Sequence, residues 1–176
     1  MSKNIHDIKR VAREGIIHVL LNEEVEHERR IIMIGDWTFA NIQKDVESIL
    51  NDEASAIFYD AGLLAGKETS KLLLNEWKER GKDFIKRWVR FYEETGTGWF
   101  KVKKFDINFE KEEAIMQITN SFIVTGYGKS KEPICHFLNG YFAGTLESIL
   151  GKKITSKETM CEAKGDPYCE FKLETY

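Results

Sequence analysis

The sequence lacks a long hydrophobic run. No stretch of its 176 residues approaches the roughly 20 apolar residues of a membrane helix, so no membrane span is predicted. Proline is scarce, with two residues, and no linker rich in proline, glycine or serine divides the chain. Positive charge is not in excess either, because 26 basic residues stand against 29 acidic ones for a net charge of −3. These absences predict one globular domain that binds neither nucleic acid nor an anionic lipid surface.

Cysteine is also scarce, with three residues, and the charged N-terminus has no signal-peptide hydrophobic core. Cysteines without an export signal are typical of a reducing compartment, so a cytoplasmic location is predicted. The sequence contains no nucleophile elbow, no zinc-protease helix motif, no dinucleotide fingerprint and no phosphate-binding loop. We therefore expect a binding domain rather than an enzyme.

The spacing of apolar residues predicts a mixture of helices and hairpins. Helical spacing covers residues 5–21, 37–50, 54–80 and 82–95, and a short apolar run at 30–35 is predicted to be a strand. Residues 99–109 and 114–125 alternate in polarity, which predicts a hairpin. Another helix is expected from about Ser130 and Pro133 to Gly151, before a terminal hairpin. The order predicts an α+β fold, an antiparallel sheet with helices packed mainly on one face.

Residues 1–29 are set apart from the main domain, residues 30–176, by a charged run that ends their helical pattern. An amphipathic helix has to bury its apolar stripe, either on the core or on a second copy of the chain. We favour a homodimer contact. The stripe comprises Ile5, Ile8, Val11, Ala12, Ile16, Val19 and Leu20.

Two pairs of glycines lie one turn apart inside predicted helices, Gly62 with Gly66 and Gly140 with Gly144. Each costs roughly 1 kcal/mol of helix stability relative to alanine, so something must offset the loss. Close approach of two helix backbones is one explanation, and clearance for a ligand is the other. The packing explanation is favoured, because glycines in this arrangement mostly mark close contact.

The three cysteines gather at the C-terminal end of the chain. Cys161 and Cys169 lie on either side of a Gly-Asp-Pro turn, at equal distances from Gly165, so a hairpin would place them face to face. Two thiolates in that position suit one zinc ion, with Cys135 as a third ligand and Glu158 as a fourth. Buried free thiols, or a Cys161–Cys169 disulfide, remain alternatives on spacing alone.

Glu158 is the least secure of these ligands, because it is three residues from Cys161 and would point to the opposite face of a regular strand. A bulge or turn near Thr159 is therefore required. His136 is the rival ligand, but it follows Cys135 on a helix and points about 100° away from it. We prefer Glu158.

The same residues carry a family resemblance. The run ETMCEAKGDPYCEF at 158–171 resembles the C-terminal signature of the 4-vinyl reductase domain family, and CHFLNGYFAG at 135–144 resembles the helix before it. The likeness extends from about Arg30 to the end of the chain. It implies a zinc ion held by Cys135, Glu158, Cys161 and Cys169, and a fold related to nitric-oxide sensors and TRAPP vesicle-tethering subunits.

The resemblance also implies a pocket for a small hydrophobic or aromatic molecule, in a sensor that works as a dimer or through a partner. Aromatic residues crowd the sequence between positions 88 and 142 and supply candidates to line such a pocket. An accessory or catalytic role in tetrapyrrole vinyl reduction, and a scaffold that binds only other proteins, are the alternative functions. The candidate pocket residues are Trp88, Tyr92, Phe122, Tyr141 and Phe142.

Overall fold

The computed structural model describes residues 34–95 and 98–176. Within these ranges the chain forms five α-helices, one 3-10 turn and a four-stranded antiparallel sheet of order β1-β2-β4-β3. The helices are α2 (Asp36–Leu50), α3 (Glu53–Trp77), α4 (Gly81–Thr95), α5 (Phe122–Tyr127) and α6 (His136–Leu150). The strands are β1 (Lys101–Asn108), β2 (Glu113–Thr119), β3 (Ile154–Met160) and β4 (Cys169–Thr175), and the 3-10 turn η1 is Glu162–Lys164.

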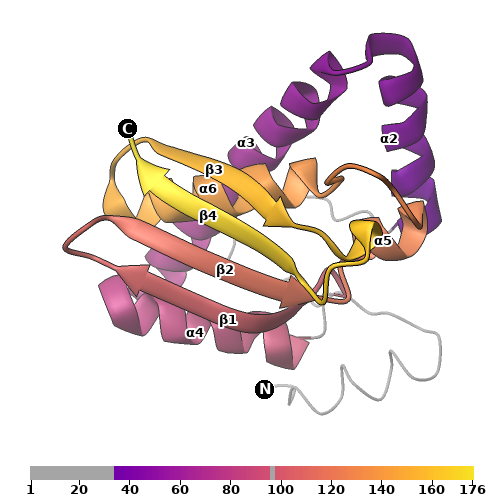
Figure 1. Ribbon diagram of the computed structural model, residues 1–176. Helices are drawn as coiled ribbons and strands as arrows, with labels where there is room; N and C mark the ends of the chain where they lie inside the picture. Colours follow the sequence, from indigo (N-terminus) through magenta and orange to yellow (C-terminus); the bar gives the residue numbers. More distant parts are fainter. Residues whose placement is uncertain (1–33, 96–97) are drawn as a thin grey trace.

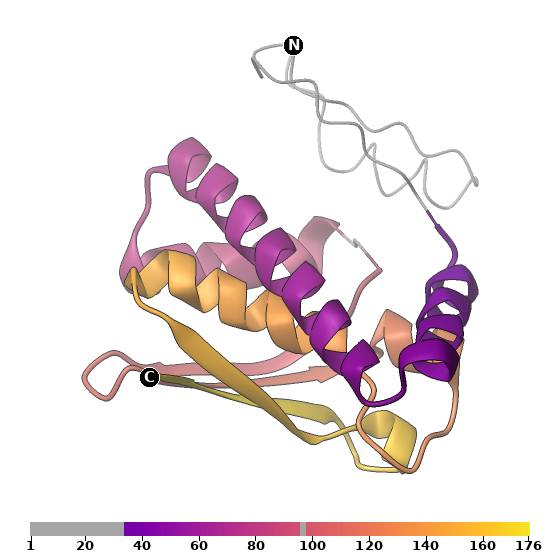
Figure 2. The same ribbon diagram turned by 90° about the horizontal axis from the view of Figure 1, so that it is seen from above.

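The predicted α+β architecture is confirmed, since the helices cover one face of the sheet (Figure 1). Seen from above, α6 and α4 lie against the sheet and α3 lies across α6 on the side away from the strands (Figure 2). Inward-pointing residues of the strands, such as Met116 and Phe171, are fully buried against α6. The core therefore lies between the sheet and its helices.

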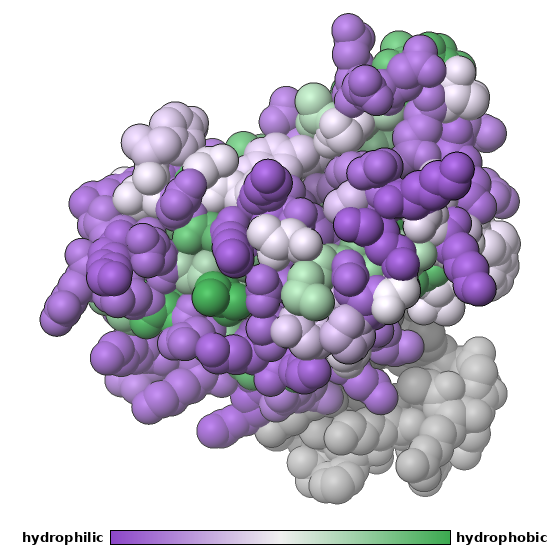
Figure 3. All heavy atoms as spheres, in the orientation of Figure 1, coloured by the Kyte–Doolittle hydropathy of each residue, from purple (hydrophilic) through white to green (hydrophobic). Residues whose placement is uncertain are grey.

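The other face of the sheet is exposed and mostly hydrophilic (Figure 3). Lys104 pairs with Asp106 at 3.2 Å, and Glu170 accepts hydrogen bonds from Gln117 and Thr159, each at 2.8 Å. An antiparallel sheet with one core face and one solvent face shows this alternation. Among the described helices, none is both long and apolar enough to cross a bilayer.

The predicted helix at residues 5–21, the N-terminal segment 1–29 and most of the predicted strand at 30–35 lie outside the described residues. Ile34 and Gly35, the described end of that strand, are not in a strand, and α2 begins directly after them. Asp36 is the first helical residue of α2, and its carboxylate accepts a hydrogen bond from the amide of Trp37.

Two local predictions were wrong. The strand expected at 114–125 ends at Thr119, and its last residues form the short helix α5. Asn120 has a positive φ of 57°, which breaks the strand, and the amide of Phe122 then donates to the carbonyl of Trp99. Alternation over a few apolar residues fits a strand and a short helix equally well, so periodicity could not separate them.

The second error concerns the start of α6. Ser130 was expected near the N-cap, but the N-cap is Cys135, five residues later. The segment before it is held by tertiary contacts. Buried Gln43 of α2 donates to the carbonyl of Ile134 at 3.0 Å, and the amide of Cys135 donates to the Glu158 carboxylate at 2.9 Å. These bonds use backbone groups that a longer helix would have needed.

The four helix glycines lie at the crossing of α3 and α6, which supports the packing explanation. A Cβ on Gly62 or Gly66 would overlap the carbonyl of Phe137 or Tyr141 on α6. The relation is reciprocal, since a Cβ on Gly140 or Gly144 would overlap a carbonyl of α3. Each helix therefore presents its glycines to the backbone of the other.

We expect Gly62→Ala and Gly140→Ala each to lower the free energy of unfolding by about 1–3 kcal/mol, because the two backbones must move apart. Helix propensity alone predicts the opposite sign, a gain of roughly 1 kcal/mol. The double variant should cost less than the sum of the single ones, since one separation accommodates both methyl groups. Urea denaturation of the three variants measures these values, and a stabilised single variant would contradict the close crossing.

Candidate functional site

The four predicted metal ligands come together in the structure. Their ligand atoms all lie within 4.8 Å of one another, and all four residues are buried. Cys135 caps the N-terminus of α6, Glu158 lies in β3, Cys161 follows β3, and Cys169 begins β4. A single cluster thus joins the start of the central helix to the C-terminal hairpin.

A bulge in β3 places Glu158 and Cys161 on the same side. Glu158 pairs with Phe171, but the next pair is Met160 with Glu170, so Thr159 has no partner in the register. The extra residue changes the inward and outward alternation of the strand. Because of it, both side chains turn toward α6, as the sequence argument required.

Polar contacts around the cluster hold its atoms in place. The amide of Glu162 donates to the Cys169 sulfur at 3.4 Å, and buried Ser121 lies with its hydroxyl 3.5 Å from the Cys135 sulfur. The amide of Cys161 donates to the Asp166 carboxylate at 2.8 Å, which fixes the turn between the two cysteines. Ser121 was missed from sequence, because a serine after a strand carries no signal that its hydroxyl will reach a cysteine.

The cluster meets three physical requirements of a metal site. All three cysteines are free thiols. The sulfurs of Cys135 and Cys169 are 3.8 Å apart, close to the ~3.8 Å that two thiolates bound at about 2.3 Å to one tetrahedral zinc ion would show. Atom Oε1 of Glu158 is buried without a hydrogen-bond partner, which is costly unless a cation or donor approaches it. The cluster could therefore bind a metal ion.

Neither of the alternatives to a three-cysteine, one-glutamate site is formed. His136 lies next to Cys135 in the chain but is not part of the cluster, and burial lowers the pKa of its imidazole. Cys161 and Cys169 form no disulfide. They are also not paired across the hairpin, since the register of β3 with β4 ends at Met160 and Glu170 and Cys161 lies beyond the end of β3.

The protonation of the cluster reflects its burial. Burial raises the pKa of the Cys135 thiol, and burial with the neighbouring Cys161 thiolate raises the pKa of Glu158 to about 9. Hydrogen bonds from Cys135 and Cys169 lower the pKa of Cys161 to about 2. For Cys169, the hydrogen bond with Cys135 lowers the pKa of the thiol. The hydrogen bond with Cys161 and burial together have the larger effect, so the pKa of Cys169 is raised.

The five candidate pocket residues belong to one continuous network of aromatic rings beside the cluster. Trp88 contacts Tyr92 with ring centroids 4.4 Å apart, and Phe142 packs on Trp88 at 6.4 Å. Tyr141 connects this group to a second one, through Trp99 at 5.3 Å, and Trp99 in turn contacts Phe122 at 5.8 Å. The second group also contains Phe39, which lies far from it in sequence, and Phe137, and neither was among the predicted pocket residues.

Polar atoms lie inside this network. The hydroxyls of Tyr92 and Tyr141 hydrogen-bond to each other, and burial raises the pKa of both. The indole Nε1 of Trp88 is buried and has no hydrogen-bond acceptor. A buried donor without a partner costs about 1–3 kcal/mol, so this atom is available to a ligand that brings an acceptor.

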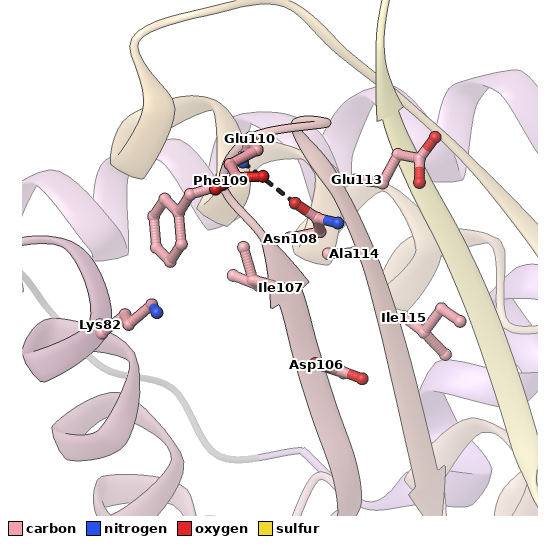
Figure 4. A pocket seen from close by; sticks show the side chains of 9 residues that line it. All are labelled: Lys82, Asp106, Ile107, Asn108, Phe109, Glu110, Glu113, Ala114 and Ile115. Atoms are coloured by element: carbon pink, nitrogen blue, oxygen red, sulfur yellow. Dashed lines mark hydrogen bonds between the residues drawn. The ribbon is translucent and has the colours of Figure 1, made fainter.

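A surface pocket of about 480 Å³ lies elsewhere, between the start of α4 and the β1–β2 turn (Figure 4). Lys82, Ile107 and Phe109 lie on the side of β1 that faces α4, and the charged residues Asp106, Glu110 and Glu113 are also part of the lining. None of the five candidate pocket residues lines it. It is therefore separate from the aromatic network.

Comparison with known proteins finds a family match in the C-terminal part of the chain. Residues 114–175 match the family model of the 4-vinyl reductase domain. The predicted resemblance to this family is thereby confirmed over these residues, which make up about a third of the chain.

Two relatives show how the similarity is distributed. An uncharacterized protein of Methanocaldococcus jannaschii, MJ0150, is 29% identical over 153 residues, which cover 74% of this chain and 86% of that protein. The phenol regulator MopR of Acinetobacter guillouiae is 26% identical over 157 residues, which cover 82% of this chain but only 27% of the regulator. The chain therefore corresponds to one part of MopR.

Solved structures share the fold at low sequence identity. The phenol-responsive sensory domain of the transcription activator PoxR, solved with phenol, has a TM-score of 0.70 at 19% identity and covers 99% of this chain and 92% of its own. A vinyl-4-reductase family protein from Methanocaldococcus jannaschii has a TM-score of 0.52 at 21% identity and covers 100% and 97%. A trafficking protein particle complex subunit 3 from Naegleria fowleri has a TM-score of 0.56 at 13% identity and covers 80% and 95%. These likenesses confirm the predicted similarity to the TRAPP-subunit fold and show that a phenol-responsive sensory domain has the same fold.

The two large pKa shifts of the cluster have opposite effects on stability. Glu158, with its raised pKa, stabilises the folded metal-free protein at low pH, and that contribution is lost as the pH rises toward 9. Cys161, with its lowered pKa, contributes at high pH, and its contribution is lost as the pH falls toward 2. Between about pH 5 and 8 the two slopes oppose each other.

We expect a bound metal ion to change this pH dependence of stability, because a divalent cation keeps all four ligands deprotonated. The free energy of unfolding of the metal-loaded protein should then rise from about pH 5.5 to 7.5, by up to roughly 1.4 kcal/mol per pH unit for each proton released. The chelator-treated protein should give a flatter profile. Urea denaturation across this range, at fixed free zinc or with chelator, measures both slopes, and equal slopes would contradict metal binding by the cluster.

Proposed function

We propose that this chain is a zinc-stabilised sensor domain that binds a small aromatic molecule within its aromatic network and acts as a homodimer. The observation that carries the proposal is the buried Trp88 Nε1, which has no acceptor. The Trp88 ring packs on Tyr92, whose hydroxyl hydrogen-bonds to that of Tyr141. A phenol-like molecule offers a ring for the aromatic side chains and an oxygen for the indole N–H. The relation to MopR and to the PoxR sensory domain supports this ligand class.

Zinc is the proposed metal, because three thiolates and one carboxylate in a compact tetrahedral arrangement match its preferences. Four protein ligands close the coordination sphere, so the ion would be structural. It would join the start of α6 to the C-terminal hairpin, and its binding energy would be part of the folding energy. Reduced thiols of this kind suit a cytoplasmic location.

The zinc content of variants tests whether the assigned cysteines, and not His136, bind the metal. Purified protein should contain one zinc ion per chain by elemental analysis. Cys169→Ser should lose it and melt at least roughly 5 °C earlier, since a loss of about 2 kcal/mol already shifts a domain of this size by that amount. His136→Ala is the control and should keep its zinc. Retention of zinc by Cys169→Ser, or its loss in His136→Ala, would reject the assigned ligands.

Ligand binding is tested by titrating phenol into the protein in a calorimeter, with benzene as the probe that lacks the hydroxyl. Phenol should bind saturably and more tightly than benzene. Trp88→Phe keeps a ring but removes the donor, so its Kd for phenol should rise roughly tenfold, the equivalent of about 1.4 kcal/mol. Trp37→Phe is the matched control, because Trp37 is 65% exposed and should not affect binding. No saturable uptake of either probe would reject the proposed site.

A further inference from the structure

Gln43 of α2 is a fully buried polar side chain that lies outside the set of metal ligands. Its Nε2 donates to the carbonyl of Ile134 at 3.0 Å and to the Glu47 carboxylate at 2.8 Å. Because both partners accept hydrogen bonds, the orientation of the Gln43 amide is fixed, and its Oε1 is left buried without a donor. A buried atom without a partner is costly, and an apolar side chain of similar size would avoid that cost. The two bonds that Gln43 makes are therefore its most evident role.

The bond to Ile134 reaches the cluster through a single peptide group. The carbonyl of Ile134 and the amide of Cys135 belong to the same peptide, and in a trans peptide these two groups point in opposite directions. Gln43 donates to the carbonyl on one side, and the Glu158 carboxylate accepts from the amide on the other side at 2.9 Å. The peptide is thus held at both ends, between α2 and β3.

This peptide lies next to two sulfurs of the cluster. It leads directly into Cys135, and the amide of Ile134 donates a hydrogen bond to Cys161, which helps to lower the pKa of that thiol. Helix α6 does not hold the peptide, because the first bond of the helix runs from the amide of Asn139 to the carbonyl of Cys135. The position of the peptide therefore depends on the side chains of Gln43 and Glu158.

Gln43 is itself held by a carboxylate that is fixed to α5. One oxygen of Glu47 accepts from Gln43, and the other accepts from the hydroxyl of Tyr127 at 2.7 Å. Lys44 of α2 also donates to the carbonyl of Tyr127 at 2.9 Å. A continuous series of hydrogen bonds thus runs from α5 through α2 to the peptide before Cys135.

We infer that Gln43 is a positioning residue of the metal site, which holds the peptide between residues 134 and 135 so that Cys135 and Glu158 present their ligand atoms to one ion. The inference rests on the proposed function, because the ion is the zinc proposed above. It also assigns the two oxygens of Glu158. Oε2 accepts from the amide of Cys135, so Oε1, which has no partner, is the atom that binds the metal.

The zinc affinity of matched glutamine variants tests the inference in the whole 176-residue chain. Gln43→Leu removes both donors at similar volume, and its Kd for zinc should rise at least about tenfold, since contacts that orient metal ligands typically change metal affinity about 10–100-fold. Gln117→Leu is the control. Gln117 also donates to a glutamate, Glu170, at 2.8 Å, but on the solvent face of the sheet, so its loss should leave the Kd unchanged. Competition with a chromogenic zinc chelator measures the three values.

A second variant guards against a folding defect that is special to leucine. Gln43→Met removes the same two donors with an unbranched side chain and should raise the Kd for zinc to a similar extent.

Cobalt(II) in place of zinc separates positioning from a merely structural role, because its visible absorption bands report the geometry of the ligands. The bands of Gln43→Leu and Gln43→Met should differ from those of the unmodified protein, and those of Gln117→Leu should not. A merely structural role of Gln43 would instead lower the urea midpoints of the metal-free and the zinc-loaded protein equally.

An unchanged zinc Kd and unchanged cobalt bands in both Gln43 variants would overturn the inference and leave the proposed zinc site in place. Absence of zinc binding by the unmodified protein would reject the proposed metal, and the role of Gln43 with it. The two failures are therefore distinguishable.

Discussion

The amide of Cys135 donates to the carboxylate of Glu158, and this bond fixes the N-cap of the central helix α6 to strand β3. The same two side chains contribute to a buried cluster with Cys161 and Cys169, so the carboxylate both orients the helix and supplies a ligand atom. Four acidic groups this close together, removed from water, cannot all be ionised without a cation. The positions of α6 and of the C-terminal hairpin therefore depend on how the charge in this cluster is compensated.

Helix α6 is restrained on its other side by α3. Glycines of each helix face carbonyl groups of the other, so the two backbones are in direct contact and cannot slide without a clash. At the far end of the crossing, Lys67 of α3 forms an ion pair with Glu147 of α6, whose carboxylate also accepts a hydrogen bond from the amide of Ile154. Helix α6 is thus held near both ends, and between them it contributes Tyr141 and Phe142 to the aromatic network.

The cluster and the aromatic network are connected through α5. Ser121 reaches the Cys135 sulfur, and the next residue, Phe122, packs on Trp99, which contacts Tyr141. A change in the rings that contact Phe122 would therefore move a residue adjacent to a hydrogen bond of the cluster. The aromatic network and the cluster are thus connected through two adjacent residues, Ser121 and Phe122.

Sequence determined the features that rest on local chemistry or on strict periodicity. Apolar spacing predicted the helices α2, α3 and α4 and the hairpin of β1 and β2. The end of α6 was predicted from Gly151, because glycine readily takes the αL conformation that ends a helix and that Gly151 adopts. The need for a bulge at Thr159 also followed, because Glu158 and Cys161 are an odd number of residues apart and strand side chains alternate.

Tertiary structure decided what depends on groups distant in the chain. The short helix α5 and the late start of α6 were not predictable, because Trp99, Gln43 and Glu158 take the hydrogen bonds that would have extended other elements. Sequence placed the four cluster residues in one neighbourhood, but only the packing of α6 on the sheet brought Ser121 and Phe39 to their positions. The physical reason is that local spacing specifies which way a side chain points on its own element, whereas the neighbour that it meets is set by how the elements pack.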